Sequence, residues 1–164
     1  METVRYCTPE WLEICALGYP EKPRFAQEFQ KMTLETCFRV KAESTWGIEK
    51  DILFGAQIEK GQLIKLVFYS QDEANEKADF ILAATPQEWK KILRKENKFM
   101  TDFMLGKILL EKGSKVKVVS LAPHSNTLVD VLTQAPLQFP DEMTPEELDA
   151  YRTYASEFRE RLGV

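Results

Sequence analysis

His124 is the single histidine of this 164-residue chain and the first residue whose type suggests chemistry. It lies in the stretch from Ala122 to Asn126, where Ser125 or Asn126 has the right side chain to cap a helix. No Gly-x-Ser-x-Gly elbow accompanies it, and Glu-x-x-His and His-x-x-x-His metal patterns are absent. We therefore predict a loop or helix-start residue, and we expect no enzyme activity, no metal site and no cofactor.

The three cysteines are the next candidates for chemistry. Cys7, Cys15 and Cys37 are odd in number and lie in the first quarter of the chain, without the C-x-x-C spacing that zinc or dithiol redox sites need. This pattern favours reduced, structural thiols. No apolar stretch suits a signal peptide or approaches the ~20 residues of a membrane span, so we expect a cytoplasmic protein.

Charge excludes one class of partner and leaves another open. With 22 basic and 26 acidic residues the net charge is -4, which argues against a nucleic-acid-binding protein. Between Pro86 and Lys117, however, bases outnumber acids. This segment is either a solvated helix face or a surface for transient contact with anionic membrane headgroups or the phosphates of an acyl-coenzyme A. The bases are Lys90, Lys91, Arg94, Lys95, Lys98, Lys107, Lys112, Lys115 and Lys117.

Helices are predicted from three similar starts. Each begins with Thr-Pro and has an acidic residue in its first turn, so that a hydroxyl caps the helix, proline occupies its first position and acids face the positive end of its dipole. Two further helices follow from apolar residues at helical spacing, among them Phe25, Phe29 and Met32. The predicted helices are Pro9 to Leu17, Lys22 to Met32, Pro86 to Lys95, Phe99 to Leu105 and Pro145 to Leu162.

Strands are predicted where the apolar period changes to two. Residues 59 to 62 supply a turn that uses Gly61, and the segment from Gln71 to Lys77 reads as a polar loop. The segment from Ala78 to Ala84 is almost wholly apolar, which suits an inner strand covered on both faces. The predicted strands are Leu34 to Ala42, Ile48 to Ile58, Leu63 to Tyr69, Ala78 to Ala84 and Ile108 to Leu110.

The last segment carries one apolar stripe, formed by Leu148, Tyr151, Ala155, Phe158 and Leu162. We expect it to pack over its own domain or cap a cavity, rather than to form a dimer seam, because so short a heptad run is marginal alone. We divide the chain into a domain of residues 1 to 135 and a tail helix within residues 136 to 164. A monomer or a weak homodimer is expected.

The order of motifs from residue 78 to 113 is specific. An Ala-Asp strand start at Ala78 is followed by an acidic, aromatic-containing helix from Glu88 to Leu93, the motif Phe-Met-x-Gly-Lys from Phe103 to Lys107, and a strand closing with Lys-Gly at Gly113. This arrangement resembles the sterol carrier protein family, in its sterol-binding, lipid-transfer domain, over about Phe25 to Leu132.

The resemblance implies an α+β fold, in which a mostly antiparallel five-stranded sheet is covered by helices and encloses an apolar tunnel. The C-terminal helix is an addition without a family counterpart. Between Gly106 and Gly113 the chain is one residue longer than the family spacing, which predicts a bulge in the strand or a shifted turn. We predict a closing helix over Ser120 to Leu132, whereas Lys115 to Val119 suits either a strand or the start of that helix.

The resemblance also implies non-catalytic binding and intracellular carriage of an apolar lipid, either a fatty acid, a fatty acyl-coenzyme A or a sterol-like molecule. An accessory module that serves a lipid-metabolising enzyme is the alternative. A ligand pocket of about 300 to 1,000 Å³ is expected. Its predicted wall residues are Phe54, Phe68, Leu82, Trp89, Leu93, Met100, Phe103, Met104, Ile108 and Leu110. Aromatic and methionine residues at helical spacing are equally typical of an ordinary core, so both readings stay open.

Overall fold

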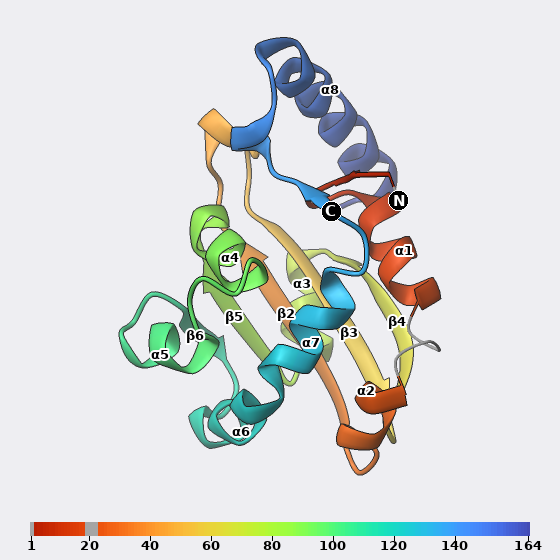
Figure 1. Cartoon of the computed structure of the whole chain (residues 1–164), viewed down its shortest axis with the longest axis vertical. Helices are drawn as coiled ribbons and strands as arrows, with labels where there is room; N and C mark the ends of the chain where they lie inside the picture. Colours follow the sequence, from red (N-terminus) through yellow and green to blue (C-terminus); the bar gives the residue numbers. More distant parts are fainter. Residues whose placement is uncertain (1, 19–22) are drawn as a thin grey trace.

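The computed structural model describes residues 2–18 and 23–164, and its centre is a five-stranded sheet in the order β4-β3-β2-β5-β6 (Figure 1). Of the four strand pairs only β2 with β5 is parallel, so the predicted mostly antiparallel sheet is confirmed. The strands are β2 (Thr33–Val40), β3 (Ile52–Glu59), β4 (Gln62–Tyr69), β5 (Phe80–Ala84) and β6 (Leu109–Lys112).

The β3–β4 hairpin turns where the sequence predicted. Lys60 and Gly61 form a two-residue loop with φ angles of 49° and 79°. Two consecutive positive φ values match the right-handed twist of a hairpin, and glycine adopts the second without strain. The hairpin therefore fixes the register of β3 against β4.

The edge strand β6 contains the expected irregularity. Ile81 pairs with Lys112 and the next residue, Leu82, pairs with Leu110, so β6 holds one extra residue. This is a β-bulge, one of the two predicted outcomes. Gly113 ends the strand at φ 103°, and a side chain there would meet the carbonyl oxygen of Asp79 at 2.5 Å, which explains the Lys-Gly ending.

The three Thr-Pro helix starts are confirmed. In α4 (Pro86–Leu93) the hydroxyl of Thr85 accepts a hydrogen bond of 3.2 Å from the backbone N–H of Glu88. In α8 (Pro145–Leu162) a complete capping box forms at Thr144, and α1 (Pro9–Gly18) begins after Thr8. Two other predicted helices are shorter than expected: α2 (Pro23–Glu28) and α5 (Phe99–Met104). The predicted first residue of α2, Lys22, lies outside the described residues.

One predicted loop is wrong and one open question is settled. Gln71–Lys77 forms helix α3 because Ser70 and Glu73 make a capping box, which the polar composition concealed. The segment from Lys115 to Val119, for which the sequence allowed either a strand or a helix, is helical and belongs to α6 (Lys115–Leu121). A 3₁₀ turn at Ala122–His124 separates α6 from α7 (Ser125–Leu132), so the predicted closing helix is two helices.

Helices cover both faces of the sheet. The helix α3 lies behind the sheet, where Ala74 packs in a small cluster with Cys37, Leu53 and Ile81 (Figure 1). In front lie α1, α4 and α7, and the edge of Trp11 meets the ring of Phe54 at 5.1 Å. The predicted inner strand is confirmed, since every residue of β5 is buried.

The segments near the two ends of the chain lie side by side. Strand β1 (Val4–Arg5) pairs in parallel with β7 (Leu137–Gln138), a pairing that the sequence analysis did not predict. The tail helix α8 packs against this region, and the hydroxyl of Tyr151 donates a 2.6 Å hydrogen bond to the backbone oxygen of Tyr6.

The three cysteines lie in the interior of the protein. Cys7, Cys15 and Cys37 are buried free thiols. Burial raises the pKa of each of them to about 12. Within residues 2–18 and 23–164, no helix combines the length and the apolar character needed to span a bilayer.

Candidate functional site

An apolar cavity of about 90 Å³ lies between the front face of the sheet and the helices that cover it. Its floor comes from β2, β3 and β5, where alternate residues point to the same face. Phe38 illustrates the alignment, because it is paired with Phe54 on one side and with Leu82 on the other. The floor residues are Leu34, Thr36, Phe38, Phe54, Ile58, Phe80 and Leu82.

The roof is assembled from segments that are far apart in the sequence. It includes α4, α5, α6 and α7, together with residues next to β1 and α2. Figure 1 shows α4 and α7 crossing the front of the sheet. The roof residues are Tyr6, Phe29, Trp89, Ile92, Leu93, Phe99, Val118, Leu121, His124, Ser125, Leu128, Val129 and Leu132.

Trp89 has a fixed position in this roof. Its indole Nε1 donates a 2.9 Å hydrogen bond to the backbone oxygen of Arg39, and its ring lies at 86° to the ring of Phe38, 5.7 Å away. The hydrogen bond satisfies the polar atom of the indole and leaves the apolar ring for the cavity. The hydrogen bond from Trp89 thus joins α4 to β2, and the Thr85 cap fixes the residue at which α4 begins.

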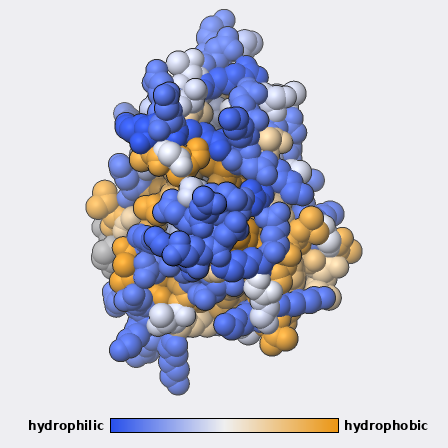
Figure 2. Space-filling model, turned by 180° about the vertical axis from the view of Figure 1, so that it is seen from behind, coloured by the Kyte–Doolittle hydropathy of each residue, from blue (hydrophilic) through white to orange (hydrophobic). Residues whose placement is uncertain are grey.

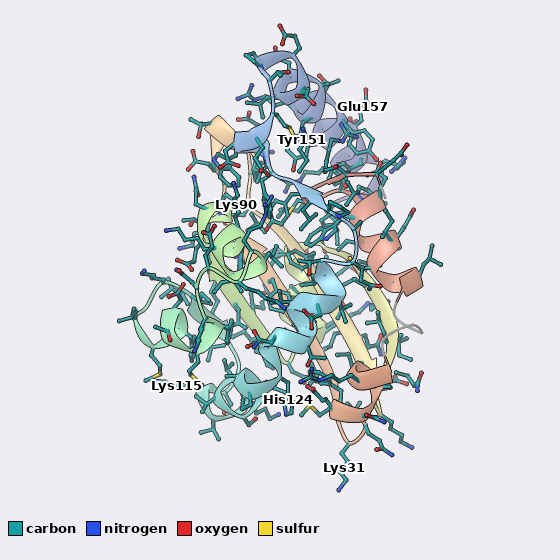
Figure 3. The ribbon with its side chains drawn as sticks, viewed as in Figure 1. Lys31, Lys90, Lys115, His124, Tyr151 and Glu157 are labelled. Atoms are coloured by element: carbon teal, nitrogen blue, oxygen red, sulfur yellow. The ribbon has the colours of Figure 1, made fainter. Side chains whose placement is uncertain are left out.

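A polar cluster closes the end of the cavity beside α2. The Glu28 carboxylate lies 3.0 Å from Nδ1 of His124 and accepts hydrogen bonds from Thr127 Oγ1 at 2.7 Å and from Arg24 Nε at 2.8 Å. Burial opposes ionisation of Glu28, but the bonds from Thr127, His124 and Arg24 outweigh it and lower the pKa of this carboxyl. The cluster therefore ties α2 to the start of α7, where Figure 3 labels His124.

A second polar pair joins α4 to α5. Burial and a hydrogen bond with Asp102 raise the pKa of Glu88, whereas the same hydrogen bond lowers the pKa of Asp102. The two shifts are opposite in sign, so the proton that the pair shares favours Glu88 over Asp102. Glu88 Oε2 has no hydrogen-bond partner among the residues that the structure describes. Asn97 Nδ2 donates a 2.8 Å hydrogen bond to Asp102, which is buried as Glu88 is.

Four of the ten predicted wall residues lie at the cavity: Phe54, Leu82, Trp89 and Leu93. Strand alternation identifies the first two, and helical spacing after the Thr85 cap identifies the others. The same alternation was available for Phe38 and Ile58, which the prediction did not include. The residues of α6 and α7 carried no comparable signal, because their contact with the cavity depends on how distant segments pack.

The other six predicted wall residues lie elsewhere. Phe68 faces the tail helix, Phe103 stacks behind Phe99 at 6.0 Å with nearly parallel rings, and Met104 is 61% exposed. Ile108 is buried outside the cavity, and Met100 and Leu110 are half-buried outside it. Met100, Phe103 and Met104 share α5 with the wall residue Phe99, whereas Phe68 lies on β4 and Leu110 on β6, two strands whose described residues do not line the cavity.

The cavity is also smaller than expected. Its volume of about 90 Å³ is below the pocket size of about 300 to 1,000 Å³ that the sequence analysis anticipated. Aromatic side chains from both layers fill most of the space, among them Phe38, Phe54, Trp89 and Phe99. The site is therefore a small cavity with an apolar wall.

The chemistry of the wall suits apolar binding. Aliphatic and aromatic side chains dominate, and the described residues of the wall include no cysteine, lysine, arginine or carboxylate. Within the part of the chain that the structure describes, no group of three or more His, Cys, Asp or Glu residues is placed to hold a metal ion.

Comparison with known proteins gives matches in structure only. No family model matches the chain, and no curated protein matches its sequence. A conserved hypothetical protein of Thermus thermophilus, described as a candidate sterol carrier protein, matches with a TM-score of 0.66 at 19% identity, over 80% of this chain and 90% of that one. A crystal structure of sterol carrier protein 2 matches with the same TM-score of 0.66 and the same identity of 19%, over 78% of this chain and 97% of that one.

A third match is sterol carrier protein 2 from Yarrowia lipolytica in its apo form, with a TM-score of 0.53 at 14% identity, over 75% of this chain and 87% of that chain. At these identities the matches establish a shared fold. It is the fold that the sequence resemblance implied.

Proposed function

We propose, from the sterol carrier protein 2 fold that this chain has, that it binds the apolar part of a lipid in the front cavity and carries it without catalysis inside the cell. The observation that carries this proposal is a cavity between two layers whose wall is built from aliphatic and aromatic side chains. Transfer of apolar surface from water into such a site gains about 25 cal/mol per Å². A fatty acid, a fatty acyl-coenzyme A and a sterol-like molecule all meet this apolar demand.

Entry of a long lipid requires part of the roof to move. The shortest α-helices in the roof or next to it are α2, α5 and α6, with six, six and seven residues. Helices this short are unstable alone and depend on the packing of their apolar faces. A ligand that replaces those contacts with its own apolar surface can therefore displace them at low cost, which makes them the moving part of the proposed site.

The test is native mass spectrometry of the purified protein, followed by extraction and identification of co-purifying lipids. A stoichiometric acyl or sterol-like ligand supports the proposal. A ligand-free mass that does not change when fatty acids, acyl-coenzyme A and sterols are added contradicts it.

We also propose that the protein makes transient contact with anionic membranes through the α5–α6 face, defined here as α5, the segment leading to β6, and α6. Exposed apolar side chains lie there, including Met104, Leu105 and Val116, the last of which is 78% exposed. Figure 2 shows apolar surface along the side of the molecule where α5 and α6 lie. A face of this composition suits insertion into the headgroup region.

Charge on the α5–α6 face complements an anionic bilayer. Lys107, Lys115 and Lys117 are exposed, and none forms an ion pair with any described residue. The opposite sides of the same helices supply Phe99 and Val118 to the cavity. Docking of this face would therefore bring the movable part of the roof to the bilayer.

The alternative function, an accessory module for an enzyme, would be favoured by an exposed apolar stripe on the tail helix. Instead, Tyr151 and Phe158 of that stripe are buried against the chain's own β1 and β4 regions. The carrier function is therefore the better supported of the two. Size-exclusion mass at two protein concentrations separates them, because a carrier of this kind needs no partner.

A further inference from the structure

Thr36 places a hydroxyl in the otherwise apolar floor of the cavity. The residue is 3% exposed and lines the cavity from the middle of β2. Its Oγ1 has no hydrogen-bond partner among residues 2–18 and 23–164. A buried polar atom without a partner typically costs about 1 to 3 kcal/mol, so its presence requires an explanation.

The surroundings of Thr36 offer no partner inside the described part of the protein. Its cross-strand neighbours are Ala56 on β3 and Phe80 on β5, and Leu34 and Phe38 flank it on the same face of β2. All four are apolar. A water molecule there would also be poorly held, because buried waters usually make about three hydrogen bonds and this wall supplies few polar atoms.

We propose that Thr36 Oγ1 binds a neutral oxygen atom of the lipid, either an alcohol or an ester carbonyl, and so selects neutral oxygenated lipids over plain hydrocarbons and ionised fatty acids. This inference rests on the proposed lipid-binding function. A threonine hydroxyl both donates and accepts, so it serves either kind of oxygen. One hydrogen bond at this place also fixes how far the lipid enters.

The preference for a neutral oxygen follows from the charges around the cavity. Among the described residues the wall has no lysine or arginine, and His124, at the α2 end, already lies against the Glu28 carboxylate. An ionised carboxylate beside Thr36 would lose its hydration without gaining a cation, which is strongly unfavourable. An alcohol or ester loses far less.

The experiment compares the affinities of octan-1-ol, octane and octanoate for the wild-type protein and Thr36 variants, by calorimetry and by tryptophan fluorescence, to which Trp89 in the cavity wall contributes. The wild type is expected to bind octan-1-ol about tenfold more tightly than octane, the usual effect of one hydrogen bond. Octanoate at neutral pH is expected to bind more weakly than octan-1-ol.

Thr36→Val removes the hydroxyl and keeps the shape, so it should bind octane at least as well as the wild type and lose the preference for the alcohol. Thr36→Ser keeps the hydroxyl and should retain the preference, and Thr36→Ala supplies a second variant without the hydroxyl. A Thr36→Val protein that still prefers octan-1-ol by tenfold overturns the role of Thr36 alone. A wild-type protein that binds none of the three ligands overturns the proposed function and this inference with it.

Discussion

The ring of Phe158 on the tail helix stacks on the ring of Phe68 on β4, with centroids 5.4 Å apart and planes at 27°. Phe68 is paired across the strands with Phe54, which lines the cavity. The tail helix thus packs on β4 beside the cavity, on the same face of the sheet as α1. It occupies the place where the sequence analysis expected one wall of the lipid site.

Replacing Phe158 with alanine should destabilise the protein by about 3 to 5 kcal/mol, because it removes a buried ring and leaves a cavity above Phe68. Urea unfolding measures this change. Glu157, the preceding residue, is exposed on the same helix (Figure 3), and Glu157→Ala should change the free energy of unfolding by less than about 0.5 kcal/mol. Equal effects of the two substitutions would contradict the assigned packing.

The Glu88–Asp102 pair should make stability depend on pH in two directions. The raised pKa of Glu88 means that its contribution is complete below the ordinary glutamate pKa and is lost as the pH rises through the raised value. The lowered pKa of Asp102 means that its contribution is present above the ordinary aspartate pKa and is lost as the pH falls through the lowered value. The pair therefore stabilises the folded protein most at pH values between the lowered pKa of Asp102 and the raised pKa of Glu88.

Glu88→Gln keeps a donor for Asp102 but cannot lose a proton. Between about pH 5 and about pH 8 its free energy of unfolding should therefore fall less than that of the wild type. Urea unfolding at both pH values gives the comparison, with Glu76→Gln on the exposed face of α3 as the control. Parallel pH profiles for Glu88→Gln and the wild type would show that Glu88 is already ionised.

Leu128→Trp should fill the cavity from the roof and prevent ligand entry. A ligand that binds only the folded state stabilises it, by about 2.7 kcal/mol at a concentration of 100 Kd. This stabilisation should appear in the wild type and vanish in Leu128→Trp, as thermal unfolding with and without octan-1-ol would show. Ile64→Trp adds the same side chain at an exposed site on β4 and should leave the ligand effect intact.

Removing two lysines from the α5–α6 face should weaken binding to anionic vesicles. Each basic residue near such a surface contributes about 1 kcal/mol, so the double variant Lys115→Gln/Lys117→Gln should bind at least about tenfold more weakly. Co-sedimentation with vesicles of phosphatidylcholine and phosphatidylglycerol measures this. The single variants Lys115→Gln and Lys31→Gln remove the same charge, and Lys31 lies at an exposed site away from this face (Figure 3), so the two form the matched comparison for net charge. Equal loss in both variants would indicate attraction without a specific face.

Local signals in the sequence predicted much of the fold, because the physics that forms these elements is itself local. The Thr-Pro starts place α1, α4 and α8, and the turn at Gly61 places the β3–β4 hairpin. The Gln71–Lys77 helix also had a local signal, the spacing of Ser70 and Glu73, but its polar composition was given more weight.

The candidate site was less predictable because it depends on packing between distant segments. The alternation of apolar residues in β3 and their helical spacing in α4 predict that Phe54 and Trp89 face the interior. Neither pattern can show that Phe158 packs beside Phe68. The hydroxyl of Thr36 is similarly ordinary in the sequence. Its missing partner becomes visible only when the two neighbouring strands and the roof are in place.

The pairing of β1 with β7 has a consequence for how the chain folds during translation. Tyr6, which lines the cavity, is held by a 3.0 Å hydrogen bond from its backbone N–H to the oxygen of Gln138. Residues 137–138 leave the ribosome long after Tyr6, and contacts between such distant segments form slowly. The cavity wall at Tyr6 is therefore completed only after residues 137–138 have been synthesised, later than all five strands of the sheet that forms the cavity floor.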